Sequence, residues 1–431
     1  MNKSNRIFFI LVFLLAIFVV LSRFYRLSHP NEMYFDEVYH VPAALLISQG
    51  DERAFEWWHS EIYGTSNHDW LHPPLAKYFQ AVSILIFGNN PFGWRFFSAF
   101  FGCGVILLTG LLVGKLTKRR WSGLLASFLV AVDGLSLVES RIAMNDIFLM
   151  FFSLISLMIY FSGFKFSRKR ILATGIFLGL ALATKWSALL VILAVLLIEV
   201  IRELRKRTIG ESFPYLVFSL TLVPVFIYVL SYTPMLLQQK NFDHFFELHR
   251  QIINYQFNRD GLHAYQSQPW QWLFNLRPVW FWRGEVNAGS VQNIYLLGNP
   301  VLVVLTIGVV FWQLKRIITY RKWQVFSRFF PEKFNRQEKV FYCYLAVLFF
   351  FNWCPWFFSP RIIFYYHFLP ANLFLLMLTS LVINQFLSKK VISLLIVGLI
   401  CTFLLYWPHW TGGVVSASLA NSIYWPFSFW R

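Results

Sequence analysis

Two adjacent carboxylates, Asp36 and Glu37, follow the first long apolar block of the chain. Ionisable residues beside hydrocarbon are costly to keep and are therefore candidates for function. Neighbouring residues of a helix point about 100° apart, so one carboxylate would face a substrate while the other holds a cation or the backbone. A solvated helix start explains the pair equally well, because the helix dipole favours acidic residues there. The pair alone leaves both interpretations open.

A second polar motif, HPPLAK at residues 72–77, lies further along the same segment. Its two prolines predict a rigid turn that opens a helix. The amphipathic stretch that follows is expected to lie along the membrane surface. A plain helix start would explain the prolines, but it does not explain why His72 and Lys77 bracket them.

Further charged residues stand at the ends of apolar blocks: Arg95, Arg141, Lys185, Arg361 and Asp146. For each cation taken alone, snorkelling of its charge to the membrane interface is the simpler explanation. In the topology given below, however, all of them share one membrane face with the carboxylate pair. Carboxylates beside several cations suit group transfer from a phosphate-linked donor, which needs a base for the acceptor and positive charge for the departing phosphate.

The composition indicates which structure positions these residues. The 431 residues are 57% hydrophobic and 13% charged, whereas soluble domains average about 45–50% and about 25%. A cytosolic enzyme could not cover its surface with so few polar residues, and a disordered chain would not be so apolar. The sequence therefore predicts an all-α polytopic membrane protein.

Apolar blocks near the length of about 20 residues that a bilayer requires set the expected spans. We expect about eleven transmembrane helices in a single membrane domain, 1–431, at 7–26, 91–114, 121–139, 146–164, 171–184, 186–201, 213–232, 295–314, 340–357, 362–386 and 391–410. No small-residue cleavage site follows the first block, so a retained anchor is expected. The polar stretches 28–90 and 233–293 are predicted to be long loops, the first with amphipathic helices.

The basic residues set the orientation. They cluster between alternate blocks, at 115–120, 165–170, 202–207 and 315–339, as cytoplasmic loops do under the positive-inside rule. Both long loops are therefore expected outside the cytoplasm. The same clusters account for the net charge of +18, so no nucleic-acid partner is expected.

A metal is the alternative cofactor hypothesis. The first long loop contains several ligand-type side chains: His40, His59, His68, Asp69 and His72. Their spacing matches no compact ligand pattern. We therefore expect no cofactor, with a divalent metal as the alternative.

Several motifs occur together in a fixed order: FDEVY at 35–39, HPPLAK at 72–77, GWRF at 93–96, SRIA at 140–143, ATKWS at 183–187, LGNP at 297–300, CPW at 354–356 and YHFLP at 366–370. Over about residues 30–370 they resemble the protein O-mannosyltransferases, the glycosyltransferase family 39 of the GT-C fold. Ala76 and Asn145 depart from the family pattern. The second loop is too short for the β-trefoil domain of eukaryotic members, so the resemblance is to a bacterial-type member.

The resemblance implies transfer of a sugar, most simply mannose, from a polyprenyl-phosphate donor to an acceptor hydroxyl, with inversion, on the non-cytoplasmic face. Protein Ser or Thr would be the acceptor, at the inner membrane of a bacterium. Asp36 would be the general base and Glu37 the second acid, paired with Arg95. Phosphate contacts would come from Lys185, Arg361, Arg95 and Arg141, with His72, Lys77 and Asp146 in support. Arg141 and Asp146 could instead form a structural ion pair.

Two other functions remain open. A related GT-C enzyme could modify a lipid or glycan, as aminoarabinose transferases do. A lipid-linked sugar transporter would need charged residues near the midplane of its spans, whereas the charges here gather at the ends of the blocks.

Overall fold

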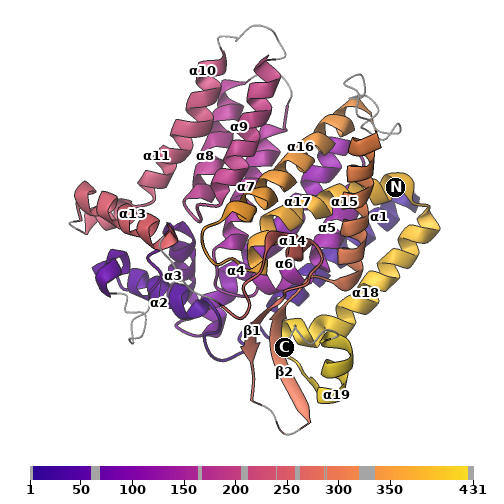
Figure 1. Ribbon diagram of the computed structural model, residues 1–431, viewed down its shortest axis with the longest axis horizontal. Coiled ribbons are helices and arrows are strands. Elements are labelled where there is room, and N and C mark those ends of the chain that lie inside the picture. Colours follow the sequence, from indigo (N-terminus) through magenta and orange to yellow (C-terminus); the bar gives the residue numbers. More distant parts are fainter. Residues whose placement is uncertain are drawn as a thin grey trace.

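The computed structural model of the chain describes residues 3–59, 68–163, 167–204, 212–238, 240–257, 263–285, 287, 289–319 and 335–425. The fold is mostly helical, as predicted: long helices run side by side, and shorter helices and a β-hairpin lie at one end of them (Figure 1). The basic clusters expected in the cytoplasm fall in part on 164–166, 205–211 and 320–334, which lie outside the described residues.

The N-terminal half consists of long apolar helices and one segment of short helices. Its elements are α1 (Lys3–Phe24), α2 (Glu37–Ser48), η1 (Glu52–Phe55), η2 (Trp57–His59), α3 (Leu75–Phe87), α4 (Pro91–Thr117), α5 (Arg120–Ala131), α6 (Gly134–Glu139), α7 (Asp146–Tyr160), α8 (Arg168–Leu182) and α9 (Ala188–Leu204). The segment between α1 and α4 is the predicted first loop, and it contains the helices α2 and α3, as expected.

The C-terminal half adds further helices and a small sheet. Its elements are α10 (Ser212–Val217), η3 (Phe218–Leu222), α11 (Val223–Leu230), α12 (Thr233–Leu237), α13 (Phe242–Phe257), α14 (Pro269–Leu273), β1 (Val279–Arg283), β2 (Ser290–Leu296), α15 (Pro300–Thr319), α16 (Arg336–Trp353), η5 (Cys354–Phe358), η6 (Tyr365–Phe368), α17 (Leu369–Phe386), α18 (Lys389–Thr411), β3 (Val414–Ser416), α19 (Ala417–Leu419) and η7 (Ala420–Tyr424).

Six helical segments of the described chain are long and apolar enough to cross a membrane: Ser4–Phe24, Pro91–Thr117, Ser212–Leu230, Glu338–Phe358, Tyr365–Phe386 and Lys389–Thr411. Other apolar helices are shorter, so the total of eleven spans stays a prediction. The expected span 121–139 is broken because α5 ends at Ala131. The carboxylate of Asp133 then accepts a hydrogen bond from the backbone N of Ser136 at 3.0 Å, which caps α6.

Close packing holds the bundle together. A Cβ atom built on Gly123 of α5 would lie 2.4 Å from the carbonyl oxygen of Gly110 in α4, so the two helices can approach only because both positions lack a side chain. Helix α17 lies among α5, α15 and α16 (Figure 1), and its apolar window is 94% buried.

The small sheet was not predicted. Strands β1 and β2 pair antiparallel with Val279 opposite Leu296, and β3 pairs antiparallel with β2 with Ser290 opposite Ser416. The hairpin projects from the end of the bundle where α2, α3 and α13 also lie (Figure 1). This end of the molecule carries the candidate site.

Candidate active site

Asp36 stands at the start of α2 with an unused carboxylate. It is the N-cap residue of the helix, but its side chain makes no capping hydrogen bond and has no hydrogen-bond partner among the described residues. Burial raises the pKa of Asp36 above its ordinary value, against the lowering effects of His40 and Lys185. A partly buried carboxylate with free lone pairs and a raised pKa is suited to accept a proton near neutral pH.

The residue before Asp36 is held in an unusual conformation. Phe35 has a φ of +50°, a region that bulky side chains rarely adopt. Its ring stacks on Phe281 of β1 at a centroid distance of 3.9 Å and meets the edge of Tyr366 at 5.8 Å. The hairpin therefore helps to fix the backbone that presents Asp36.

Glu37 has a different environment from its neighbour. Its Oε1 accepts hydrogen bonds from Arg95 Nε at 2.8 Å and from the backbone N of Ala143 at 3.0 Å, and its Oε2 accepts one from Arg95 Nη2 at 2.8 Å. Both charged side chains are fully buried. The structure thus forms the expected Glu37–Arg95 pair, which ties the start of α2 to α4 and to the segment before α7.

Arg95 and Arg141, two of the expected phosphate ligands, are occupied elsewhere. Arg95 also donates to the carbonyl oxygens of Leu27, Pro30 and Glu32 at 2.7–3.1 Å. Arg141 donates to three carbonyl oxygens at 2.9–3.0 Å, those of Ser22, Arg23 and Tyr25. Both guanidinium groups therefore anchor the end of α1 and the chain that follows it, and the geometry does not favour a phosphate role for either.

Asp146 at the start of α7 pairs with Lys185, at 2.7 and 2.9 Å from its Nζ. The alternative ion pair with Arg141 is therefore not formed. Lys185 Nζ also lies 5.2 Å from the centre of the Tyr366 ring, and Tyr366 interacts electrostatically with Asp36 and Arg361. Charged groups from four separate parts of the sequence thus gather around one aromatic ring.

Arg361 is the cation of this group that is held least tightly. It is partly exposed, its Nη1 donates to Gln256, and its Nη2 lies 3.1 Å from His367 Nε2. Neither partner is a carboxylate. An anion could therefore bind Arg361 without displacing another negative charge.

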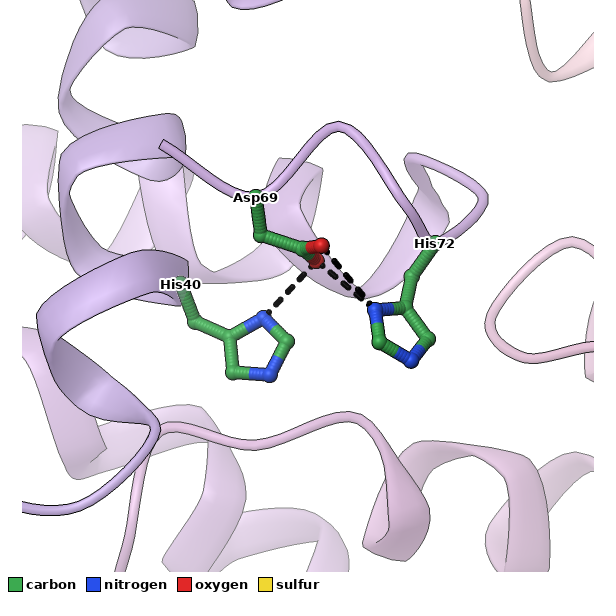
Figure 2. A group of neighbouring side chains, drawn as sticks. All are labelled: His40, Asp69 and His72. Atoms are coloured by element: carbon green, nitrogen blue, oxygen red, sulfur yellow. Dashed lines mark hydrogen bonds and ion pairs between the residues drawn. The ribbon is translucent and has the colours of Figure 1, made fainter. Parts of the chain in front are cut away.

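His40, Asp69, His72 and Lys77 form a cluster in the first outer segment, here called the first-loop cluster. Figure 2 shows both imidazole rings turned toward the carboxylate of Asp69. The Nδ1 atoms of His40 and His72 lie 3.1 and 3.0 Å from Asp69 Oδ2, and Lys77 Nζ lies 2.8 Å from the same oxygen. Burial alone would raise the pKa of Asp69, but His72, Lys77 and His40 outweigh it and hold the pKa well below its usual range. Burial lowers the pKa of His72 to about 4.

The sequence places His40, Asp69 and His72 together as possible metal ligands and Lys77 as a supporting residue, but it does not indicate that Lys77 pairs with Asp69. Glu139 is a further residue that was not predicted; it is 1% exposed and has no hydrogen-bond partner for either carboxylate oxygen in the described chain. Glu139 interacts electrostatically with Asp146, Lys185 and Asp36, so it belongs to the surroundings of the site.

Two family models match almost the whole chain. The model described as dolichyl-phosphate-mannose-protein mannosyltransferase matches residues 13–239, and the C-terminal four-transmembrane region of protein O-mannosyltransferase matches residues 241–430. The chain belongs to the protein O-mannosyltransferase family. The resemblance drawn from the ordered motifs is thereby confirmed.

Bacterial relatives share the family name. A polyprenol-phosphate-mannose–protein mannosyltransferase of Corynebacterium glutamicum is 26% identical over 73% of this chain and 72% of its own length. The enzyme of that name from Mycobacterium tuberculosis is 25% identical over 97% of this chain and 91% of its own length. Protein O-mannosyltransferases are glycosyltransferases, so the chain is an enzyme of that class and a multi-pass membrane protein.

Solved structures of low identity confirm the fold. The Saccharomyces cerevisiae Pmt1–Pmt2 protein O-mannosyltransferase complex bound to the sugar donor aligns with a TM-score of 0.81 at 16% identity, covering 100% of this chain and 93% of that chain. ArnT from Cupriavidus metallidurans bound to undecaprenyl phosphate aligns with a TM-score of 0.58 at 13% identity, covering 93% and 64%. The predicted GT-C fold is therefore confirmed.

Proposed function

We propose that this family member transfers mannose from a polyprenyl-phosphate donor to a Ser or Thr hydroxyl of a protein acceptor, with inversion at the anomeric carbon. The single observation that carries the proposal is the unused, partly buried carboxylate of Asp36 beside the Lys185–Tyr366–Arg361 group. The names of the bacterial relatives support both the donor and the protein acceptor.

In this mechanism Asp36 takes the proton of the acceptor hydroxyl while the oxygen of that hydroxyl attacks the anomeric carbon. The new bond forms as the bond between that carbon and the phosphate oxygen breaks, and the phosphate leaves with the bonding electrons. General-base action contributes about 10²–10⁴ in rate. Glu37 cannot take this role without losing Arg95, because its carboxylate oxygens accept the guanidinium donors.

Arg361 and Lys185 would hold the donor phosphate. Arg361 has no carboxylate partner among its hydrogen bonds. Lys185 is already paired with Asp146, so it would bridge that carboxylate and the phosphate with different hydrogens of its ammonium group, which carries three donors. Positive charge fixed beside the leaving oxygen stabilises the charge that develops there.

We place the reaction on the outer face of a bacterial inner membrane. The actinobacterial relatives support a bacterial membrane. The basic clusters of the sequence support an outer position for both loops. In this arrangement α2, α3 and α13 meet the donor headgroup while its lipid tail stays in the bilayer.

Modification of a lipid or glycan is the second candidate function. The fold likeness to ArnT bound to undecaprenyl phosphate favours it. Incubating the purified protein with polyprenyl-phosphate mannose and either a Ser/Thr-rich peptide or lipid and glycan acceptors, followed by mass spectrometry, separates the two. A peptide heavier by one hexose supports protein mannosylation, a modified lipid or glycan alone supports the second function, and Asp36→Asn serves as the control.

A further inference from the structure

The first-loop cluster places three partners around one carboxylate oxygen. His40, Asp69 and Lys77 are 4%, 6% and 3% exposed, so these side chains are removed from water. The Nδ1 atoms of both histidines and the Nζ of Lys77 all lie within 3.1 Å of Asp69 Oδ2. Lys77 Nζ also donates to the carbonyl oxygen of His72 at 3.1 Å.

Without Lys77, the remaining side chains would form a metal-binding set. Two imidazole nitrogens and one carboxylate oxygen are the ligands that zinc and related divalent metals take in open sites. One ligand atom from each of His40, Asp69 and His72 lies within 4.8 Å of the others. A small cavity of about 10 Å³, lined in part by Asp69, His72 and Lys77, borders the cluster and has room for about one particle the size of a water molecule.

Lys77 competes directly with such an ion. A metal bound to Asp69 Oδ2 would sit about 2 Å from that oxygen, and the Lys77 ammonium lies 2.8 Å from the same atom. Two cations so close together in a buried site repel strongly. The ammonium group of Lys77 is also held by its hydrogen bond to the carbonyl oxygen of His72, which opposes its displacement by a metal ion.

We propose that Lys77 is the resident cation of the first-loop cluster, taking the place of a divalent metal, and that the cluster with Lys77 in it positions Asp36 through His40. Lys77 is thus a positioning residue for the transfer reaction. This part of the proposal rests on the proposed function, whereas the exclusion of a metal does not.

The path from the cluster to Asp36 is short. His40 follows Asp36 by one helical turn, and its backbone N donates to the Asp36 carbonyl oxygen at 3.1 Å. Residues spaced in this way lie on the same face of a helix. The backbone N of Asp69 donates to the Tyr39 carbonyl oxygen at 3.0 Å, so Asp69 holds the first turn of α2 through both its backbone and its side chain. Lys77 keeps the Asp69 carboxylate compensated in a buried place, where an unpaired charge would be costly.

Cobalt absorption spectroscopy tests the exclusion of a metal. Purified wild type, Lys77→Ala and the control Lys77→Ala/His72→Ala are titrated with Co²⁺, whose visible bands report coordination by protein ligands. We expect one equivalent to bind to Lys77→Ala, and none to the wild type or to the double variant. Stoichiometric binding by the wild type overturns the proposal, and so does a folded Lys77→Ala protein that binds no cobalt. Should Lys77→Ala fail to fold, Lys77→Ser and the wild type decide the question in the same way.

Mannose transfer tests the positioning role. Loss of one contact between charged groups predicts that kcat of Lys77→Ala falls by about tenfold to a hundredfold, with little change in KM for the donor. Added Zn²⁺ should restore part of kcat in Lys77→Ala but not in Lys77→Ala/His72→Ala, because only the former retains both histidines. An unrescued Lys77→Ala protein that binds cobalt overturns the positioning role. A wild type that transfers no mannose overturns the proposed function instead and leaves the cobalt result standing.

Discussion

The buried Glu37–Arg95 pair predicts a large loss of stability when Arg95 loses its charge. In Arg95→Met the side chain keeps a similar length, but the fully buried carboxylate of Glu37 loses two charge-assisted hydrogen bonds, and three carbonyl oxygens lose a donor. Breaking a buried ion pair by removing one partner costs about 3–5 kcal/mol. We expect the free energy of unfolding to fall by that amount, measured by reversible unfolding in mixed detergent micelles.

A double-mutant cycle shows where the loss comes from. The variant Glu37→Gln/Arg95→Met leaves no uncompensated charge, so its loss should be smaller than the sum of the two single losses. Donor affinity of the folded fraction of Arg95→Met should stay near the wild-type value, because all the guanidinium contacts are structural. Wild-type stability combined with weak donor binding would refute this reasoning and return Arg95 to the phosphate site.

Three further expectations follow from the site. Lys185→Ala and Arg361→Ala should each weaken polyprenyl-phosphate binding by about tenfold to a hundredfold in donor titrations. Arg361→Lys should recover only part of the loss, because an ammonium lacks the guanidinium fork. Unchanged affinity in both alanine variants would contradict the phosphate assignment. Burial raises the pKa of Asp36, and the base must be ionised to act. The value of kcat should therefore fall on acidification at a higher pH than the ordinary carboxyl pKa of about 4. A kcat that stays constant down to that pH would contradict the environment described for Asp36. A cysteine at Ser290, in an otherwise cysteine-free protein, should react with an impermeant thiol reagent added outside intact cells, and reaction only after lysis would invert the topology.

Residue types and their order were enough to predict the helical membrane fold and the family. Composition and block length report directly on the solvent that surrounds a helix. The motifs at 35–39 and 72–77 also led to Asp36 and to two members of the first-loop cluster. These features are local in the sequence, so reading along the chain could find them.

Which charged side chains pair with one another depends on the tertiary structure. Arg95 and Arg141 have the sequence context of interfacial cations, but the fold brings the carbonyl oxygens of residues that follow α1 against them. Asp146 meets Lys185 because α7 and α8 pack side by side, and nothing in the sequence separates that pairing from one with Arg141. The pairing of β3 with β2 escaped prediction for a similar reason, since β3 follows β2 by more than a hundred residues.

The most direct test of the central claim is the single-turnover rate of mannose transfer by Asp36→Asn. The substitution keeps the shape of the side chain and removes the proton acceptor, so the rate should fall by about 10²-fold or more. Donor affinity and melting temperature, measured on the same preparation, should stay near the wild-type values. A transfer rate close to that of the wild type would contradict the account, and it would move the general base to another carboxylate of the site.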